Sequence, residues 1–148
     1  MRAGSPEAFL LVAAGGAAGG LLRYGAVQLF AEPTIGFGWT TWTVNGVGCL
    51  ALGFLVAGVL PTDEHTWLRP ALGTGLVGGF TTFSAVAQTT QVTAFSNSPT
   101  ALAYLLGSVA IGLLGVLTGT ALGARWSVLR AERHPHHELP PDIEEGLP

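Results

Sequence analysis

Four long apolar runs, separated by short polar segments, dominate the chain. They cover residues 9–30, 39–60, 67–95 and 101–126. A bilayer core of roughly 30 Å is crossed by about 20 helical residues, so each run is long enough to span a membrane. Backbone groups in lipid must be hydrogen-bonded internally, which favours helices. The pattern therefore predicts an all-α membrane protein with four transmembrane helices.

The third run, residues 67–95, is too long and too interrupted to be one plain helix. Its centre reads Gly78-Gly79-Phe80-Thr81-Thr82-Phe83-Ser84. Irregular backbone at membrane depth persists only where it faces protein, water or an ion. We therefore expect the third helix to be broken at its centre, at the glycine pair Gly78-Gly79, and we expect this break to be the functional site.

Glycines recur at helical spacing in the first and fourth runs. They are Gly15, Gly16, Gly19 and Gly20 in the first run and Gly115, Gly119 and Gly123 in the fourth. Small residues four apart allow membrane helices to approach closely. We expect both helices to pack tightly on a neighbour.

Composition supports a small membrane protein. Apolar residues make up 49 % of the chain, charged residues only 10 %, and 22 residues are glycine. Residues 1–126 are expected to form one transmembrane domain, and the polar residues 127–148 a disordered tail. The tail histidines could bind a metal weakly, but a solvated tail is the simpler interpretation. The net charge of −3 comes mostly from the tail and gives no support to a nucleic-acid partner.

Two polar side chains inside the apolar runs have two interpretations each. Arg23 either extends its guanidinium to the membrane interface or lines a water-filled cavity where it attracts anions. Asn45 either bonds to a neighbouring helix or lines a polar path. In the fourth run, Tyr104 and Ser108 lie one turn apart on a face that can donate hydrogen bonds.

The positions of the acidic residues narrow the classes of function that the chain could have. The acids Glu7, Glu32, Asp63 and Glu64 all fall at run ends or in loops. No nucleophile with a histidine partner can be placed at one depth, so we expect that the protein is not an enzyme. The lack of a buried acid also disfavours a proton-coupled exporter of cations. Hydroxyl and amide donors, an arginine and phenylalanine ring edges suit an anion.

Three segments of the chain resemble the signature segments of the Fluc/CrcB fluoride channels. They are Gly15-Gly16-Ala17-Ala18-Gly19-Gly20-Leu21-Leu22-Arg23-Tyr24, Thr43-Val44-Asn45-Gly46-Val47-Gly48 and Gly78-Gly79-Phe80-Thr81-Thr82-Phe83-Ser84. The resemblance covers roughly residues 9–126. It implies an antiparallel, dual-topology dimer of four-helix subunits in the inner (plasma) membrane, which passes fluoride out of the cytoplasm passively and so relieves fluoride toxicity.

The resemblance also implies roles for individual residues. A sodium ion at the dimer centre is held by backbone carbonyls at the break from both subunits, and the corresponding residues here are Gly78 and Thr81. Residues corresponding to the anion path are Asn45, Phe83 and Ser84, with Tyr104 and Ser108 on the polar face of the last helix. Where the family usually continues with Thr-Phe, this sequence has Ala85 and Val86. The second pore phenylalanine and a neighbouring hydroxyl are therefore missing.

The distribution of arginine bears on the partner subunit. With four spans, one side of the membrane carries Arg2, Arg69, Arg125, Arg130 and Arg133. The loops at 31–38 and 96–100 contain no Lys or Arg. This bias predicts that both termini lie in the cytoplasm. A fixed orientation would require an oppositely oriented homologue as partner, whereas a homodimer requires one sequence to insert both ways.

Both kinds of dimer remain open at this point, and so does a second class of function. That class is a small antiparallel exporter, or a membrane partner that does not itself conduct. The charges inside the spans, an arginine and no acid, favour the channel.

Overall fold

The computed structural model of the chain describes residues 5–30, 36–60 and 68–133, and these residues contain helices and no β-strand. The elements are α1 (Pro6–Leu29), α2 (Trp39–Phe54), the π-helix η1 (Leu55–Val59), the π-helix η3 (Arg69–Val77), α3 (Gly78–Phe80), α4 (Phe83–Ala94) and α5 (Ser98–Arg133). The prediction of an all-helical fold is confirmed.

Three of the described helical segments are long and apolar enough to cross a membrane. They are Pro6–Leu29, Trp39–Val59 and Ser98–Glu132. Their lengths suit a bilayer core, and the chain is accordingly a multi-pass membrane protein. The third apolar run of the sequence forms the shorter elements η3, α3 and α4 instead of one long helix.

Side-chain caps fix where α1 and α5 begin. Before α1, the Ser5 Oγ accepts a hydrogen bond from the Ala8 N–H at 3.3 Å, and Pro6 occupies the first helical position. Before α5, the Asn97 Oδ1 accepts a hydrogen bond from the Thr100 N–H at 3.0 Å. Such caps satisfy N–H groups that have no partner within the helix.

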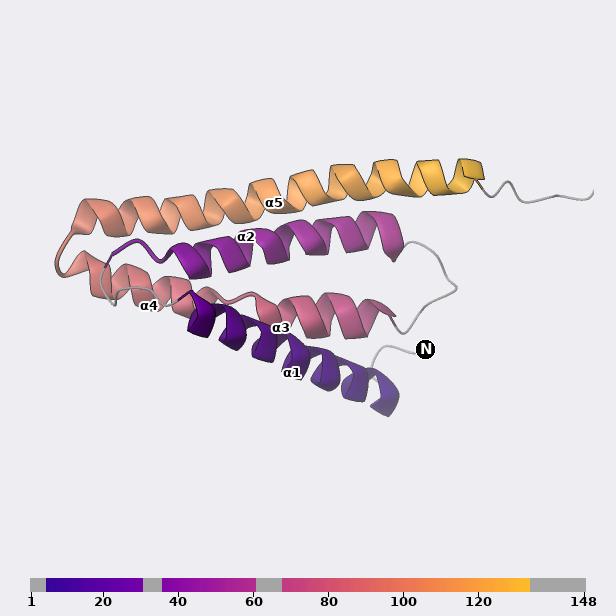
Figure 1. The fold of residues 1–148 in the computed structure, drawn as a ribbon, viewed down its shortest axis with the longest axis horizontal. Coiled ribbons are helices and arrows are strands. Elements are labelled where there is room, and N and C mark those ends of the chain that lie inside the picture. The colour runs from indigo at the N-terminus through magenta and orange to yellow at the C-terminus, as the bar shows by residue number, and fades with distance from the viewer. Residues whose placement is uncertain (1–4, 31–35, 61–67, 134–148) are drawn as a thin grey trace, which may run out of the picture.

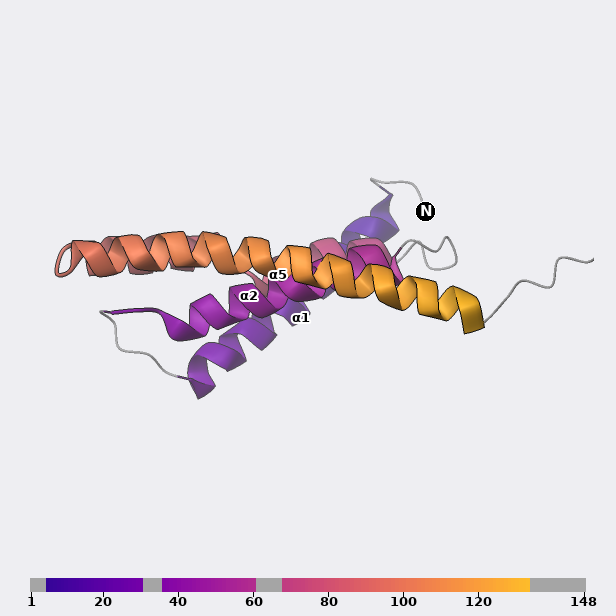
Figure 2. The same ribbon diagram turned by 90° about the horizontal axis from the view of Figure 1, so that it is seen from above.

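The helices lie in a fixed order across the molecule. Figure 1 shows α5 beside α2, the series η3, α3 and α4 below them, and α1 on the far side of that series. Helix α5 packs against both α2 and α4, and α1 packs on η3 and α3. Figure 2 shows that α1 crosses the direction of α5 steeply. The start of α1 and the end of α5 lie at the same end of the molecule, which we call the terminal end (Figures 1 and 2).

Glycines bring the backbones of neighbouring helices into contact. A Cβ atom added to Gly15 would overlap the carbonyl oxygen of Ala71, and one added to Gly19 would overlap that of Leu76. On the other side of the molecule, a Cβ on Gly119 would overlap the carbonyl oxygen of Leu50. The predicted tight packing of the first and fourth helices is therefore confirmed.

Helix α5 continues past Trp126 to Arg133, seven residues beyond the predicted end of the fourth run. The stretch 127–133 contains neither Gly nor Pro, and the first proline follows at Pro135. Without a residue that breaks helices, the helix extends into the polar segment. Residues 134–148, with the tail histidines, lie outside the described residues.

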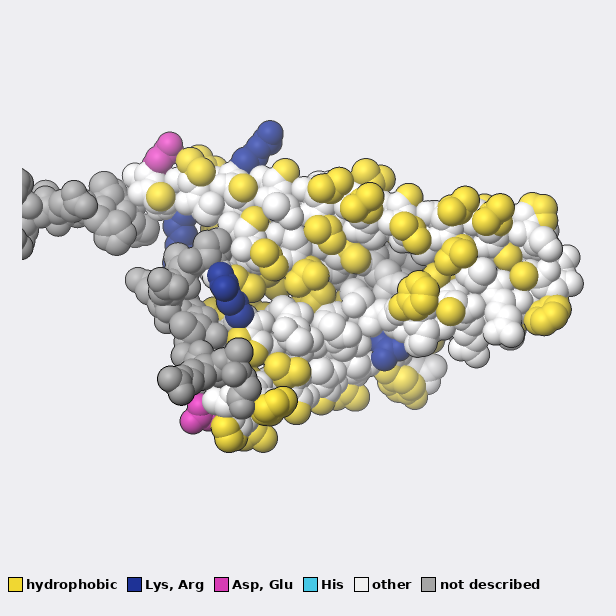
Figure 3. Space-filling model, turned by 180° about the vertical axis from the view of Figure 1, so that it is seen from behind, with side chains coloured by type: hydrophobic (Ala, Val, Ile, Leu, Met, Phe, Trp, Pro, Cys, Tyr) yellow, Lys and Arg dark blue, Asp and Glu magenta, His cyan; other side chains and the backbone are white. Residues whose placement is uncertain are grey.

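Large apolar side chains cover the outer faces of the helices. Leu21, Leu29, Leu106 and Leu113 are all exposed on the surface of the chain. Figure 3 shows apolar side chains spread over one face of the molecule, with few charged ones among them. An apolar surface of this extent suits contact with lipid or with another membrane protein.

Candidate functional site

The chain leaves helical geometry at Thr81 and Thr82, between α3 and α4. Thr81 has φ −81° and ψ 156°, and Thr82 has φ −151° and ψ 125°, so both residues are extended. Gly78 and Gly79 belong to the helix α3. The interruption therefore begins after Phe80, and the predicted position at Gly78-Gly79 is wrong.

Packing and capping explain why the interruption follows the glycines. A Cβ on Gly79 would overlap the carbonyl oxygen of Gly16, so this glycine serves the close approach of α3 to α1. The side chain of Thr82, in contrast, accepts a hydrogen bond from the Ala85 N–H at 3.3 Å and begins α4. Threonine is a good N-cap because its hydroxyl replaces a missing backbone acceptor. The new helix begins at the hydroxyl residue.

Asn45 of α2 holds the extended residue Thr82 by two hydrogen bonds. The Asn45 Nδ2 donates to the Thr82 carbonyl oxygen at 2.8 Å, and the Asn45 Oδ1 accepts from the Thr82 N–H at 2.8 Å. This pairing resembles that of a neighbouring β-strand, and only one orientation of the amide satisfies both bonds. Because the amide nitrogen carries two hydrogens, one N–H of Asn45 remains for another acceptor.

Arg23 of α1 contacts the end of α3. The Arg23 Nε donates to the Gly79 carbonyl oxygen at 3.3 Å, and the side chain is half-buried. The last carbonyls of a helix lack partners within it and carry partial negative charge, so a guanidinium is favourable there. Arg23 therefore binds backbone, which is a role that neither interpretation of the sequence foresaw.

A cavity of about 620 Å³ lies beside the interruption and is formed by α2, α3, α4 and α5. Its lining residues are Asn45, Cys49, Gly78, Thr81, Thr82, Phe83, Val86, Ser108, Val109, Gly112, Leu113 and Val116. Five residues singled out from the sequence are thereby brought together: Asn45, Gly78, Thr81, Phe83 and Ser108. The remaining three, Arg23, Ser84 and Tyr104, are not among the lining residues.

Sequence reasoning placed Thr82 in the stretch expected to be functional but gave it no role of its own. The available signal was a hydroxyl residue shortly before an apolar helical pattern, which is typical of an N-cap. It also missed Cys49 and Gly112, whose place in the lining follows from the packing of α2 on α5. No local pattern marks such residues.

Tyr104 lies in an aromatic cluster at the end of the molecule opposite the terminal end. Its side chain is fully buried, and its ring meets that of Phe37 edge to face with the centroids 5.1 Å apart. Phe37 also contacts Trp39 and Trp42. The Ser108 Oγ donates to the Tyr104 carbonyl oxygen at 2.7 Å, so the two residues do lie one turn apart.

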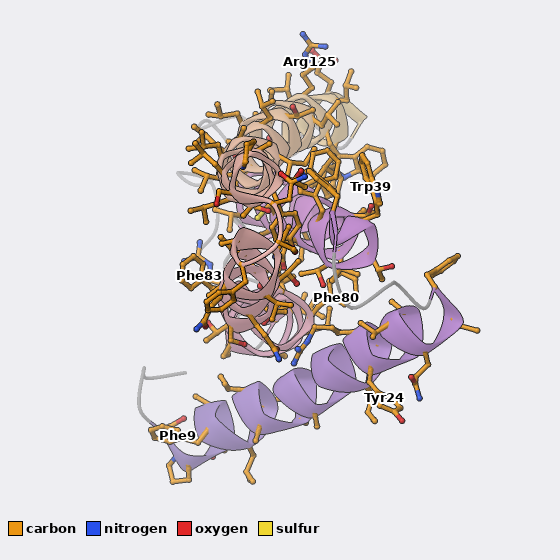
Figure 4. All side chains as sticks on the ribbon, turned by 90° about the vertical axis from the view of Figure 1, so that its left-hand side faces the viewer. Phe9, Tyr24, Trp39, Phe80, Phe83 and Arg125 are labelled. Carbon is orange, nitrogen blue, oxygen red and sulfur yellow. The ribbon has the colours of Figure 1, made fainter. Side chains whose placement is uncertain are left out.

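The two aromatic residues of the interruption lie in different surroundings. Phe83 is 74 % exposed on the surface of the chain and borders the cavity. Figure 4 shows Phe83 pointing away from the helices, while Phe80 lies between them. Val86, one turn after Phe83 in α4, is buried. The cavity is therefore open on the side where Phe83 projects.

Hydrogen-bond donors remain available at the start of α4. The hydroxyls of Thr82 and Ser84 lie 3.0 Å apart and share one hydrogen bond, which leaves one of their two protons free. The backbone N–H groups of Phe83 and Ser84 stand in the first turn of α4, where helix geometry provides no acceptor. Together with the second N–H of Asn45, these groups favour an anion at the positive end of a helix.

Acceptors remain available on the other side of the interruption. Within the described part of the chain, no group donates to the carbonyl oxygens of Gly78 and Thr81. An unsatisfied carbonyl at membrane depth is costly. The described residues also contain no cluster of three His, Cys, Asp or Glu side chains that could hold a metal ion. A cation at this point would therefore be bound by main-chain oxygens.

The chain matches one protein family and several relatives whose names agree with one another. The family described as CrcB-like protein, Camphor Resistance (CrcB), matches residues 10–120. A protein of Paracoccus denitrificans named fluoride-specific ion channel FluC is 46 % identical over 116 residues, which are 78 % of this chain and 93 % of the relative. A FluC 2 of Nocardia farcinica is 40 % identical over 132 residues, covering 86 % and 92 % of the two chains. A FluC of Phocaeicola vulgatus is 34 % identical over 115 residues, covering 76 % and 95 %.

Proposed function

Because the chain belongs to the family of CrcB-like proteins, we propose that it is a subunit of a fluoride channel that lets fluoride leave the cytoplasm passively. The observation that carries the proposal is the interruption between α3 and α4. There Asn45 holds Thr82 by two hydrogen bonds, and donors collect inside an otherwise apolar membrane protein. The relatives from Paracoccus denitrificans and Nocardia farcinica are named fluoride-specific ion channels.

The chemistry of the cavity suits a small, strongly hydrated anion. Crossing a membrane requires that protein donors replace the hydration shell of the ion. The free N–H of Asn45, the shared hydroxyls of Thr82 and Ser84, and the positive edge of the Phe83 ring can supply this replacement. Among the described residues, no acidic side chain lines the cavity, so none of them places a negative charge that repels the anion there.

A sodium ion is proposed for the carbonyl side of the interruption. The carbonyl oxygens of Gly78 and Thr81 are without donors in the described structure, and Gly78 is exposed with open space around it. Hard cations prefer oxygen ligands, and two such carbonyls need further ligands to complete a shell. A second subunit that contributes its own Gly78 and Thr81 would complete it. The ion would neutralise these carbonyls and join the subunits.

The partner is proposed to be a second channel subunit in antiparallel orientation. In one chain the cavity is open and Phe83 projects from the surface, so the anion path has protein on one side only. The series η3, α3 and α4 would provide a fourth membrane crossing made of two halves. The partner is either this same chain or an oppositely oriented homologue, and both candidates fit the open cavity.

The inner (plasma) membrane is the proposed location, with both termini in the cytoplasm. Arg69 and Arg125 lie toward the terminal end of the bundle, where η3 begins and α5 approaches its end. Basic residues favour the cytoplasmic side. With this orientation, the short connection between α4 and α5 faces outward.

An exporter that couples transport to protons is the second candidate. Such a transporter requires a side chain that exchanges protons at membrane depth, usually a carboxylate. None of the described residues that line the cavity beside the interruption is such a group. The channel is therefore the function that the described residues favour.

Growth of a fluoride-sensitive bacterium tests the proposed function. A strain without its own fluoride exporter should grow on fluoride when it expresses the wild-type chain, together with a partner subunit if one is required. The Asn45→Asp variant should fail, and the Gln28→Glu variant should succeed, because Gln28 is exposed near the end of α1 and its side chain donates to the Tyr24 hydroxyl. Normal rescue by Asn45→Asp, at equal membrane expression, would disprove the role of the interruption.

A further inference from the structure

A second cavity, of about 440 Å³, lies near the terminal end of the bundle. It is lined by Leu52, Val56, Leu60, Arg69, Gly73 and Thr74. Only two of these residues, Arg69 and Thr74, carry polar side chains. The cavity therefore combines an apolar wall with one cation and one hydroxyl, and the anion path described above does not use either group.

The second cavity and the cavity at the interruption lie between the same helices, with α2 and η1 on one side and η3 and α3 on the other. We call this boundary the seam. Along α2 and η1, Asn45 and Cys49 line the first cavity, and Leu52 and Val56 line the second. These positions are four, three and four residues apart and so lie on one face of the helix. On the opposite side of the seam, Thr74 of η3 precedes Gly78 of α3 by one turn.

The guanidinium of Arg69 is fixed at the outer end of this seam. Its Nε donates to the Leu60 carbonyl oxygen at 3.0 Å, directly after the end of η1. Only one of the five N–H donors of the guanidinium is used by this bond. The side chain is exposed, and among the described residues no carboxylate forms an ion pair with it. The Thr74 side chain is exposed as well.

We propose that Arg69, with Thr74 beside it, recruits the transported anion at the terminal end of the seam and so raises its concentration at the entrance to the path. This inference rests on the proposed function. The residue acts as an entrance group and not as a ligand at the interruption, because η3 and α3 place more than two helical turns, on the order of 10 Å or more, between Arg69 and Thr81. At that distance a single charge is largely screened in physiological salt, where the Debye length is about 8 Å.

Ionic strength separates this role from a structural one. A cation that raises the local anion concentration acts strongly in dilute salt and weakly in concentrated salt. Loss of the Leu60 hydrogen bond, in contrast, would disturb the end of η1 equally at all salt concentrations. The Arg69→Gln variant removes the charge and keeps an N–H donor, whereas Arg69→Lys keeps the charge.

The experiment measures fluoride efflux from proteoliposomes at constant low fluoride, in a background of impermeant salt. At about 0.01 M ionic strength, Arg69→Gln should reduce the initial rate about threefold, which is below the tenfold or more that whole charged clefts reach. At about 1 M, where the Debye length falls to about 3 Å, the rate should equal that of the wild type. Arg69→Lys should retain the wild-type rate at both concentrations.

Arg125→Gln is the matched control, because Arg125 is an exposed cation on α5 that lines neither cavity. Figure 4 shows its side chain pointing away from the bundle. Its rate should match the wild type at low salt. An equal deficit for Arg69→Gln at both ionic strengths would show a structural role and overturn the proposal, and so would an equal deficit for Arg125→Gln at low salt.

Lipid headgroups supply the other anion that Arg69 could bind. The measurements should therefore be repeated in vesicles with and without phosphatidylglycerol. The deficit of Arg69→Gln should persist without the anionic lipid; a deficit that requires phosphatidylglycerol would assign Arg69 to the headgroup and overturn the proposal. Absence of fluoride efflux from the wild-type chain would instead contradict the proposed function itself, which keeps the two failures distinct.

Discussion

Asn45 and Thr82 pair through two hydrogen bonds of 2.8 Å each, although 37 positions of the chain separate them. One side chain on α2 thereby satisfies both main-chain groups of a residue in the interruption. The same amide retains one N–H beside the cavity. The geometry of the interruption and the supply of donors for an anion therefore depend on the same residue.

The first prediction concerns the substitution Asn45→Asp. The carboxylate can still accept from the Thr82 N–H, but it cannot donate to the Thr82 carbonyl oxygen. Loss of a hydrogen bond of this kind costs about 1 kcal/mol, and the new negative charge repels fluoride. We expect the initial rate of fluoride efflux from proteoliposomes to fall by roughly tenfold or more, as each 1.4 kcal/mol on a barrier gives tenfold in rate.

The Asn45→Asp protein must first be shown to elute as the wild type does in gel filtration. Gln28→Glu makes the same chemical change at an exposed position of α1 and should leave the rate unchanged. Wild-type efflux from well-folded Asn45→Asp would remove Asn45 from the anion path.

A second prediction compares two adjacent glycines of α1. A methyl group at Gly19 would overlap the carbonyl oxygen of Leu76, whereas the position beside Gly20 has no heavy atom within 4 Å. Overpacking of this kind costs typically about 1–3 kcal/mol. We expect Gly19→Ala to lower the melting temperature in detergent and Gly20→Ala to leave it unchanged. Equal melting temperatures for the two variants would show that α1 does not pack as described.

The third prediction concerns Arg23. Removal of its Nε donor leaves the Gly79 carbonyl oxygen without a partner at the end of α3. Hydrogen bonds to charged groups contribute about 1.5–3 kcal/mol. We expect Arg23→Leu to lower the melting temperature as Gly19→Ala does. The exposed Arg130 of α5 provides the control Arg130→Leu; a loss of stability that is as large for this variant would mean that the Gly79 contact contributes nothing specific.

The fourth prediction follows from the proposed sodium site. An ion that binds only the assembled subunits stabilises them by RT ln(1 + [L]/Kd), or about 2.7 kcal/mol at a hundred times Kd. Replacement of sodium by N-methylglucamine should therefore lower the melting temperature of the purified dimer, and added sodium should restore it in a saturable way. A melting temperature that is independent of sodium between nominally zero and about 0.1 M would count against the site.

The comparison of sequence and structure shows which features are local. The apolar runs and the glycine spacing predicted the helices and the close packing of α1 and α5, because both depend on periodicity along the chain. The interruption was predicted in the correct segment, but it was assigned to Gly78-Gly79. These glycines remain helical because α1 approaches them closely, and the hydroxyl of Thr82 begins the next helix instead.

The features that were not predicted depend on contacts between distant segments. The Arg23 contact joins residues separated by 56 positions, and the burial of Tyr104 depends on Phe37, which precedes α2. Such contacts follow from how the helices are placed against one another, and no short pattern encodes that placement. Asn45 was recognised as a polar residue in an apolar run, but its partner was not.

Fluoride efflux from proteoliposomes containing the purified wild-type chain, with its partner subunit if the complex requires one, tests the central claim most directly. Vesicles loaded with potassium fluoride are diluted into fluoride-free buffer, valinomycin removes the charge imbalance, and a fluoride electrode records the release; parallel vesicles hold chloride. The proposed channel predicts rapid fluoride release that needs no proton gradient, and little chloride release. Fluoride release that occurs only with an imposed proton gradient, or no release from correctly folded protein, would contradict it.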